Sequence, residues 1–167
     1  RVIVVDRGGT GGGALYLNRA LAIGDAPRFE TVSRHQDALS VDDLRRASVV
    51  LLNDIAVPAA LARRLQRFVE GGGGLFVAVG SRATWSQDVD VLPAVLQAPV
   101  DRTRGDAARI GALEYGHPVF EPFRAPRSGD FAAARIYGYR TVMPAADAQV
   151  LARFDGGAPA LLERRIG

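Results

Sequence analysis

The sequence predicts an α/β fold in which helices cover both faces of a parallel sheet and antiparallel strands follow towards the C-terminus. Through residues 1–80, short apolar runs alternate with helical segments, which is typical of parallel strands joined by crossover helices. Beyond them, a turn signal at Asp155-Gly156-Gly157 indicates a hairpin. The chain has 167 residues, of which 48% are apolar and 23% are charged. These values favour one domain spanning residues 1–167.

The first strand and the first helix are separated by a cluster of glycines. Residues 2–5 are a continuous run of valine and isoleucine, as in a strand buried on both faces. Gly8–Gly13 follows, and the spacing of apolar residues then predicts a helix over 14–23. Ser40 and Asp43 have the spacing of a capping box, which marks the start of a helix. The other elements expected here are strands at 29–33 and 48–52 and a short helix at 44–47.

The clearest helix begins at Pro58, a residue that suits the first helical turn. Its apolar residues lie on one stripe, with arginines on the opposite side. The stripe consists of Leu61, Leu65, Phe68 and Val69. Gly71–Gly74 ends the helix, and residues 75–79 are expected to form the fourth strand.

The second half predicts a different organisation, with strands that pair antiparallel. Strands are expected at 148–154 and 158–166 on either side of the hairpin turn. We expect these strands to extend the edge of the parallel sheet. The remaining predictions are a short helix at 91–97, a strand at 107–115, a loop at 120–130 and a strand at 131–142.

Composition excludes several functional classes. The chain has no cysteine, so disulfides and thiolate metal sites are impossible. All 21 basic side chains are arginines, and the net charge of +3 is spread along the chain, so we expect no nucleic-acid partner. No apolar run approaches the roughly 18 residues that cross a bilayer. The chain begins inside a strand without a methionine, which suggests a module excised from a longer protein.

The glycine cluster is the first candidate binding site. Gly9 and Gly11 belong to residues 9–14, which fit G-x-G-x-x-G/A between a strand and a helix, where backbone N–H groups can hold a pyrophosphate. Gly8, directly before them, is a further candidate of this loop. The segment resembles the cofactor loop of NADP-dependent ketoreductases, in which Ser33-Arg34 would meet a 2′-phosphate. The chain has no Tyr-x-x-x-Lys pair, because it has no lysine. We therefore expect a flexible loop and no cofactor, and keep an NADP-binding reductase as an alternative.

The second candidate is the end of the fourth strand, at Gly80-Ser81. A serine nucleophile on a sharp turn follows the pattern G-x-S-x-G, which this segment does not match. A hydrolase using Ser81 would also need a base, and the only histidines are His35 and His117. A serine hydrolase pairing Ser81 with His117 is kept as a second alternative, while a turn serine that bonds the backbone is the preferred interpretation.

The third candidate unites Asp6, at the end of the first strand, with Asn53 and Asp54 at the end of the third. The carboxyl ends of parallel strands meet at one edge of a sheet, so these residues should converge near Gly80. Their oxygens could bind a cation. We favour the simpler role of capping helices and tightening turns, and expect no metal.

Eight short segments, spread over most of the chain, together resemble a known protein family. They lie at residues 2–6, 15–21, 49–54, 68–80, 117–120, 134–137, 150–154 and 159–165. Together these segments resemble the three-layer, flavodoxin-like fold of class I glutamine amidotransferases. More narrowly, they resemble the module of bacterial aerotolerance-operon (Bat) membrane proteins that accompanies a von Willebrand factor A domain.

The resemblance implies that catalysis has been lost. An amidotransferase of this class needs a cysteine near Ser81 and a His-Pro-Glu motif, where this chain has His117-Pro118-Val119. We therefore expect a non-catalytic module for protein interaction or assembly, with protein partners or neighbouring domains of the same chain. The family layout implies a module on the extracytoplasmic side of the bacterial inner membrane, anchored by segments outside this sequence. A cytoplasmic location is the alternative, and the sequence does not determine the oligomeric state.

Overall fold

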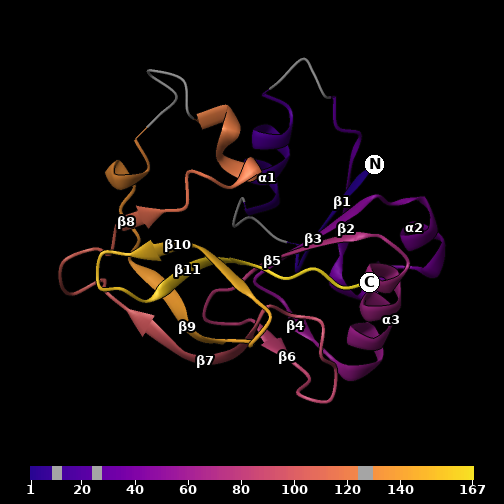
Figure 1. Cartoon of the computed structure of the whole chain (residues 1–167). Helices are drawn as coiled ribbons and strands as arrows, with labels where there is room; N and C mark the ends of the chain where they lie inside the picture. The colour runs from indigo at the N-terminus through magenta and orange to yellow at the C-terminus, as the bar shows by residue number, and fades with distance from the viewer. Residues whose placement is uncertain (9–12, 24–27, 124–129) are drawn as a thin grey trace. The chain divides into compact units, whose positions relative to one another are not determined.

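The chain folds into two compact units, residues 1–91 with 166–167 and residues 92–165 (Figure 1). The structure is a computed structural model, and it describes residues 1–8, 13–23, 28–123 and 130–167. The first unit contains the parallel sheet with its helices, and the second contains antiparallel sheets. The predicted α/β class, a parallel sheet followed by antiparallel strands, is therefore confirmed.

Four parallel strands form the sheet of the first unit. They are β1 (Val2–Asp6), β2 (Thr31–His35), β3 (Val49–Asn53) and β5 (Gly74–Ala78), in the order β2-β1-β3-β5. Every neighbouring pair in this order is parallel, as the alternation of strands and helices predicts. β4 (Ala56–Val57) and β6 (Thr84–Trp85) form a separate short parallel pair.

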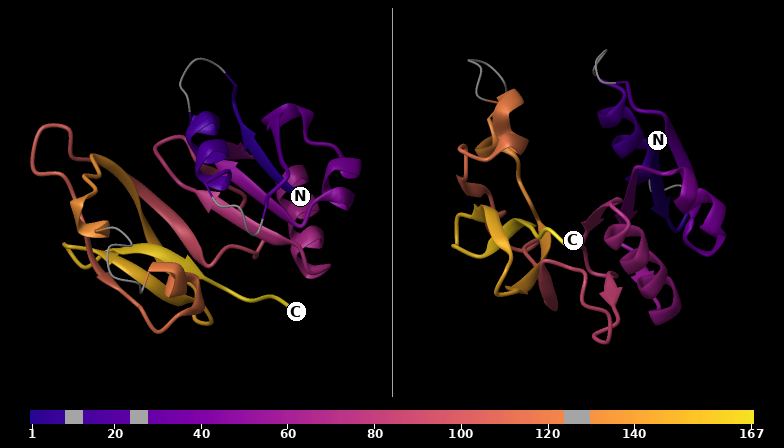
Figure 2. Two further views of the ribbon diagram at one scale, coloured as in Figure 1. Left: turned by 90° about the horizontal axis from the view of Figure 1, so that it is seen from above. Right: turned by 45° about the vertical axis from the view of Figure 1, so that its right-hand side comes forward.

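Helices cover the sheet on both faces (Figure 2). Helix α1 (Gly13–Leu21) packs against the face that carries Val2, Val4 and Leu51. The side chains of the opposite face are fully buried, because α2 (Val41–Arg46) and α3 (Ala59–Glu70) lie on that side. These side chains are Ile3, Val5, Val50 and Leu52.

The buried side of helix α3 matches the apolar stripe predicted from the sequence. Pro58 is its N-cap, and Leu61 and Leu65 are at most 4% exposed. At the other end, Gly72 has φ of 91° and Gly73 N–H donates to the Phe68 carbonyl at 2.9 Å. This glycine-dependent stop returns the chain into β5.

Helix α2 begins with the predicted capping box. Asp43 N–H donates to Ser40 Oγ at 3.0 Å, and Ser40 N–H donates to Asp43 Oδ2 at 3.0 Å. Arg34 of β2 donates from Nε and NH2 to Asp43 Oδ1 at 3.1 and 2.9 Å. The bonds from Arg34, and then those from Ser40, lower the pKa of Asp43 to about 2.

We predict that Asp43→Asn destabilises the protein by about 1 kcal/mol at pH 7, the usual value of a helix cap. The Asp43 pKa is lower in the folded chain than the value of about 3.9 expected when unfolded, so this stabilisation is complete above pH 4 and lost as pH falls towards 2. Urea unfolding of wild type and variant at several pH values measures the difference. A difference in unfolding free energy that stays constant down to pH 2 would contradict the assignment.

The second unit is built from antiparallel strands. β7 (Ala94–Asp101) pairs with β9 (Gly138–Pro144), while β8 (Ile110–Leu113), β10 (Gln149–Phe154) and β11 (Pro159–Glu163) form a sheet in the order β11-β10-β8. The predicted hairpin of β10 and β11 is confirmed, and its turn uses Gly157 at φ of 83°. These strands pair with one another in sheets of their own rather than on the edge of the parallel sheet.

Three other expectations are corrected. Residues 91–97 do not form a helix, because the apolar run enters β7, where Val95 and Leu96 pair with β9. Residues 131–133 form a 3-10 helix capped by Asp130, so the expected strand begins only at Gly138. The expected loop starts with a 3-10 helix over Pro118–Phe123. A further 3-10 helix spans Gln36–Ala38.

Candidate functional site

The carboxyl ends of β1, β3 and β5 lie at one edge of the parallel sheet, here called the carboxyl edge. Val5 pairs with Leu52 and Asn53 pairs with Ala78. The chain beyond these strands therefore places Asp6 near the end of β3, and Asp54 near the segment that leaves β5. The structure thus brings the predicted candidates Asp6, Asp54 and Gly80 to one edge of the sheet. Their hydrogen bonds indicate what role they have there.

Asp54 organises the segment that leaves β5. Its Oδ1 accepts hydrogen bonds from the backbone N–H groups of Gly80, Arg82 and Ala83, at 2.9, 3.0 and 2.8 Å. Its Oδ2 accepts from Arg82 Nε at 3.0 Å, and the side chain is 18% exposed. Because three amides converge on one oxygen, the carboxylate folds residues 80–83 into a tight turn.

Backbone geometry confirms that this turn is closely fitted. Asp54 has φ of 45°, a left-handed conformation that Asp and Asn tolerate better than most residues. A Cβ on Gly80 would lie 2.7 Å from Asp54 Cγ, closer than atoms approach, so Gly80 makes room for the carboxylate. Ser81 lies inside this turn, between two of the bonded amides. The preferred interpretation, turn formation by Asp54, agrees with this geometry.

Asp6 closes a second turn at the end of β1. Its Oδ1 accepts from Gly8 N–H at 2.9 Å, and Gly8 has φ of 68°. A side chain on Gly8 would face His35 Cδ2 at 3.3 Å. Gly9 and Gly11 of the proposed cofactor loop lie outside the described residues. In the described part of the chain, no group of three or more histidine, aspartate or glutamate side chains is placed to hold a metal ion.

The side chain of His117 makes its contacts with residues of the second unit. Its Nδ1 accepts from Val119 N–H at 3.3 Å, so the proton is assigned to Nε2, which lies 3.1 Å from Glu163 Oε2. The ring is 10% exposed, and Arg165 Nε donates to the other oxygen of Glu163 at 2.9 Å. A base for Ser81 would need a free ring nitrogen, and both nitrogens of His117 are engaged here.

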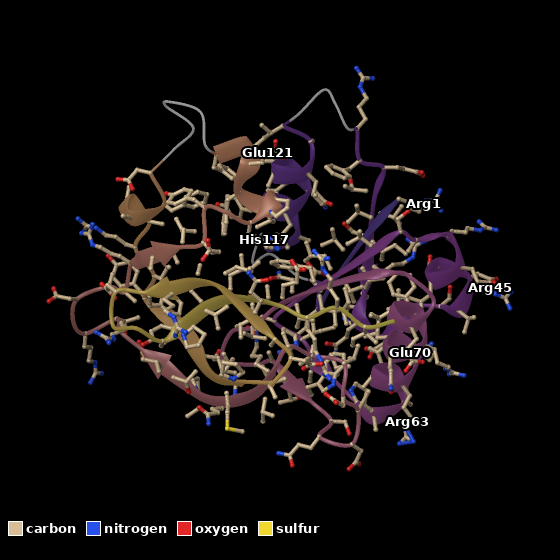
Figure 3. The ribbon with its side chains drawn as sticks, viewed as in Figure 1. Arg1, Arg45, Arg63, Glu70, His117 and Glu121 are labelled. Atoms are coloured by element: carbon tan, nitrogen blue, oxygen red, sulfur yellow. The ribbon has the colours of Figure 1, made fainter. Side chains whose placement is uncertain are left out.

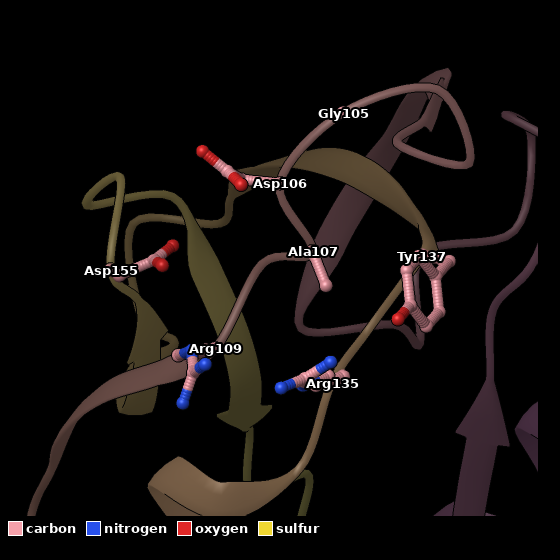
Figure 4. Close-up of a pocket in the computed structure, with 7 residues that line it drawn as sticks. All are labelled: Gly105, Asp106, Ala107, Arg109, Arg135, Tyr137 and Asp155. Carbon is pink, nitrogen blue, oxygen red and sulfur yellow. The ribbon is translucent and has the colours of Figure 1, made fainter.

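The structure also contains a pocket that sequence reasoning missed. It lies in the second unit, has a volume of about 430 Å³, and is lined mainly by charged and polar side chains (Figure 4). These are Asp106, Arg109, Arg135, Tyr137 and Asp155. Arg109, Arg135 and Tyr137 come from the two segments expected to be strands, 107–115 and 131–142. Asp106 precedes the first segment, and Asp155 belongs to the hairpin turn. No motif in the sequence indicates that the two segments pair.

The outward face of α1 carries large exposed apolar side chains next to the exposed Arg19. On α1 and the turn that continues it, Leu15, Tyr16 and Ile23 are 50%, 71% and 85% exposed. Other helices present charged side chains outward, as Arg45 of α2 and Arg63 of α3 do (Figure 3). We call Leu15, Tyr16 and Ile23 the α1 surface.

No family model matches the chain. Two solved structures from Salmonella resemble it. The cytoplasmic protein STM3548 of Salmonella typhimurium is 19% identical with a TM-score of 0.69, and the match covers 96% of this chain and 81% of that one. The cytoplasmic protein STM1381 of Salmonella typhimurium LT2 is 17% identical with a TM-score of 0.67 and the same coverages, 96% and 81%. At such identities the likeness shows the fold alone.

These comparisons correct the classification of the chain as a membrane-associated, amidotransferase-like protein. Both neighbours are described as cytoplasmic proteins, and neither description mentions a membrane or an amidotransferase. Across the described residues, no helix combines the length and the apolar character needed to cross a bilayer. The narrower resemblance to a von Willebrand factor A-associated module stays a prediction.

Proposed function

We propose that this chain is a non-catalytic module that binds other proteins, or neighbouring domains of its own chain, in the bacterial cytoplasm. The α1 surface is the observation that supports the proposal most. The cytoplasmic setting is drawn from the two Salmonella proteins, which share the fold.

The physical argument concerns the two sides of α1. Ala14, Leu17 and Leu21 pack against the sheet, as the buried side of an amphipathic helix should. The outward side would then be polar in a helix that faces water. Leu15 and Tyr16 stand on that side instead, together with the exposed Arg19. Large exposed apolar side chains bordered by a charged residue are typical of a surface that binds a partner.

The groups that could have carried catalysis serve the fold. The Asp54 carboxylate holds three backbone amides and Arg82. His117 is engaged by Glu163 and by the Val119 amide. A general base needs a free position within hydrogen-bond reach of its substrate. These contacts favour binding over catalysis as the role of the chain.

A photo-cross-linking amino acid in place of Tyr16 tests this proposal in cells. We expect one discrete cross-linked adduct, either with another protein or within the full-length chain, and the same adduct with the cross-linker at Ile23, because both side chains belong to the α1 surface. With the adduct partner purified, Leu15→Asp should weaken its binding at least about tenfold, as expected when one apolar contact is replaced by a buried charge.

The matched control places the cross-linker at Arg63, an exposed position on α3. Arg63 should give no such adduct. The proposal would be overturned if Tyr16 gave no discrete adduct, if Arg63 gave the same adduct, or if Leu15→Asp left the affinity for the purified partner unchanged.

A further inference from the structure

The pocket of the second unit is built on one isolated β-bridge. Ala108 and Ile136 exchange both backbone hydrogen bonds, each at 2.9 Å. In an antiparallel pair, the residues on either side of such a bridge face each other. The bridge therefore places Arg109 beside Arg135, and Ala107 beside Tyr137.

The alternation of side chains then separates core from pocket. Ala108 is 2% exposed and points into the unit. Its neighbours on the two segments point to the other face, and all four of those neighbours line the pocket. Figure 4 shows Arg135 pointing towards Arg109, with the Tyr137 hydroxyl on the same side.

This arrangement sets two positive charges side by side. Like charges directly opposite in an antiparallel pair repel and destabilise it. Arg109 NH1 donates to the Ala132 carbonyl at 3.3 Å. Within the described ranges, no ion pair joins Arg109 or Arg135 to a carboxylate. The pair is therefore poised to accept an anionic group, since two guanidinium groups bind a carboxylate in a fixed geometry.

Carboxylates line the same pocket. In Figure 4 the side chains of Asp106 and Asp155 lie above those of the arginines, and Asp155 N–H donates to the Arg109 carbonyl at 2.9 Å. Asp155 Oδ1 accepts from Gly156 N–H at 3.0 Å, which fixes its position in the hairpin turn. A ligand that is only anionic would be repelled by these carboxylates, and a ligand that is only cationic would be repelled by the arginines.

We propose that this pocket binds a zwitterion that carries an ammonium and a carboxylate on one molecule, as a free amino acid or a short peptide does. The carboxylate lies against Arg109, Arg135 and the Tyr137 hydroxyl, and the ammonium lies against Asp106 and Asp155. The pocket, of about 430 Å³, is open to solvent and its charged side chains are exposed, so the ligand binds at the surface. This proposal does not depend on the α1 surface.

Titration of the isotope-labelled full chain by NMR tests it. The probes are the twenty common L-amino acids and alanyl-alanine, each up to about 10 mM, ten times a Kd of about 1 mM. We expect saturable shifts of the Arg109 and Tyr137 amides with at least one probe. Comparing the free amino acids with the dipeptide distinguishes the two sources of the zwitterion.

Two sets of controls separate this site from general ion binding. The N-acetyl derivative and the amide derivative of the bound probe each lack one charge, and each should bind at least about tenfold weaker, the loss of one charged hydrogen bond. Inorganic phosphate should not compete. Arg135→Gln and Asp106→Asn should each weaken binding similarly. Arg104→Gln, the same charge change outside the pocket lining, should leave binding within about twofold.

The proposal is overturned if no probe binds, if the N-acetyl derivative or phosphate binds as well as the zwitterion, or if Arg135→Gln binds like the wild type. The Arg135 and Asp106 side chains are exposed, so both variants should fold. Their amide spectra away from the pocket verify this.

Discussion

Replacing Asp54 with alanine will lower the free energy of unfolding by about 2–4 kcal/mol. The substitution removes the acceptor of three backbone N–H groups at residues 80, 82 and 83 and the partner of Arg82. Leaving buried donors without acceptors costs about 1–3 kcal/mol, and bonds to a charged group are stronger than average. Ala83 is 2% exposed, so water cannot readily replace the lost bond to its amide.

Urea unfolding at neutral pH measures this loss. Asp54→Asn should keep much of the stability, because its amide oxygen can still accept from the backbone and asparagine tolerates the left-handed conformation. Asp88→Ala, an exposed aspartate of the same unit, should change stability by less than about 0.5 kcal/mol. Equal effects at Asp54 and Asp88 would contradict the assigned role of Asp54.

Replacing Gly80 with alanine will destabilise the chain by about 1–3 kcal/mol, the usual cost of inserting a methyl group into a filled space. The new Cβ would lie 2.7, 2.8 and 2.9 Å from Asp54 Cγ, Oδ2 and Oδ1. The carboxylate would have to move, and its bonds to the turn amides would lengthen. Gly156→Ala is the matched control, since a Cβ there meets nothing within 4 Å.

The two substitutions should couple strongly. In an Asp54→Gly background the obstructing carboxylate is gone, so Gly80→Ala should then change stability by less than about 0.5 kcal/mol. The interaction energy in a double-mutant cycle should therefore be about 1–3 kcal/mol. Additive effects would show that Gly80 and Asp54 do not share this contact.

Much of the first unit could be predicted from sequence because its signals are local. The Val2–Val5 run, the Ser40 and Asp43 capping box and the stripe of α3 each lie within a few residues. The second unit was harder. Residues 91–97 are a short apolar run that suits either a helix or a strand, and their partner in β9 lies more than forty residues away. Pairing over such distances decides the element.

The same contrast applies to the sites. The rule that parallel strands end at one edge was enough to bring Asp54 and Gly80 together. It could not show that one oxygen accepts from three amides, because those donors lie 26, 28 and 29 residues further along the chain. The pocket depends on the pairing of Ala108 with Ile136, which no motif in the sequence marks.

The charged groups of the carboxyl edge stabilise the fold, and we propose the α1 surface and the pocket as the parts that carry function. Amide hydrogen exchange of the native chain tests this division most directly, at Gly80, Arg82 and Ala83. We predict that these three amides are protected in the wild type and lose protection selectively in Asp54→Ala, while β1 amides keep theirs. Exchange of the three amides at unprotected rates in the wild type, or at rates that Asp54→Ala leaves unchanged, would contradict the account.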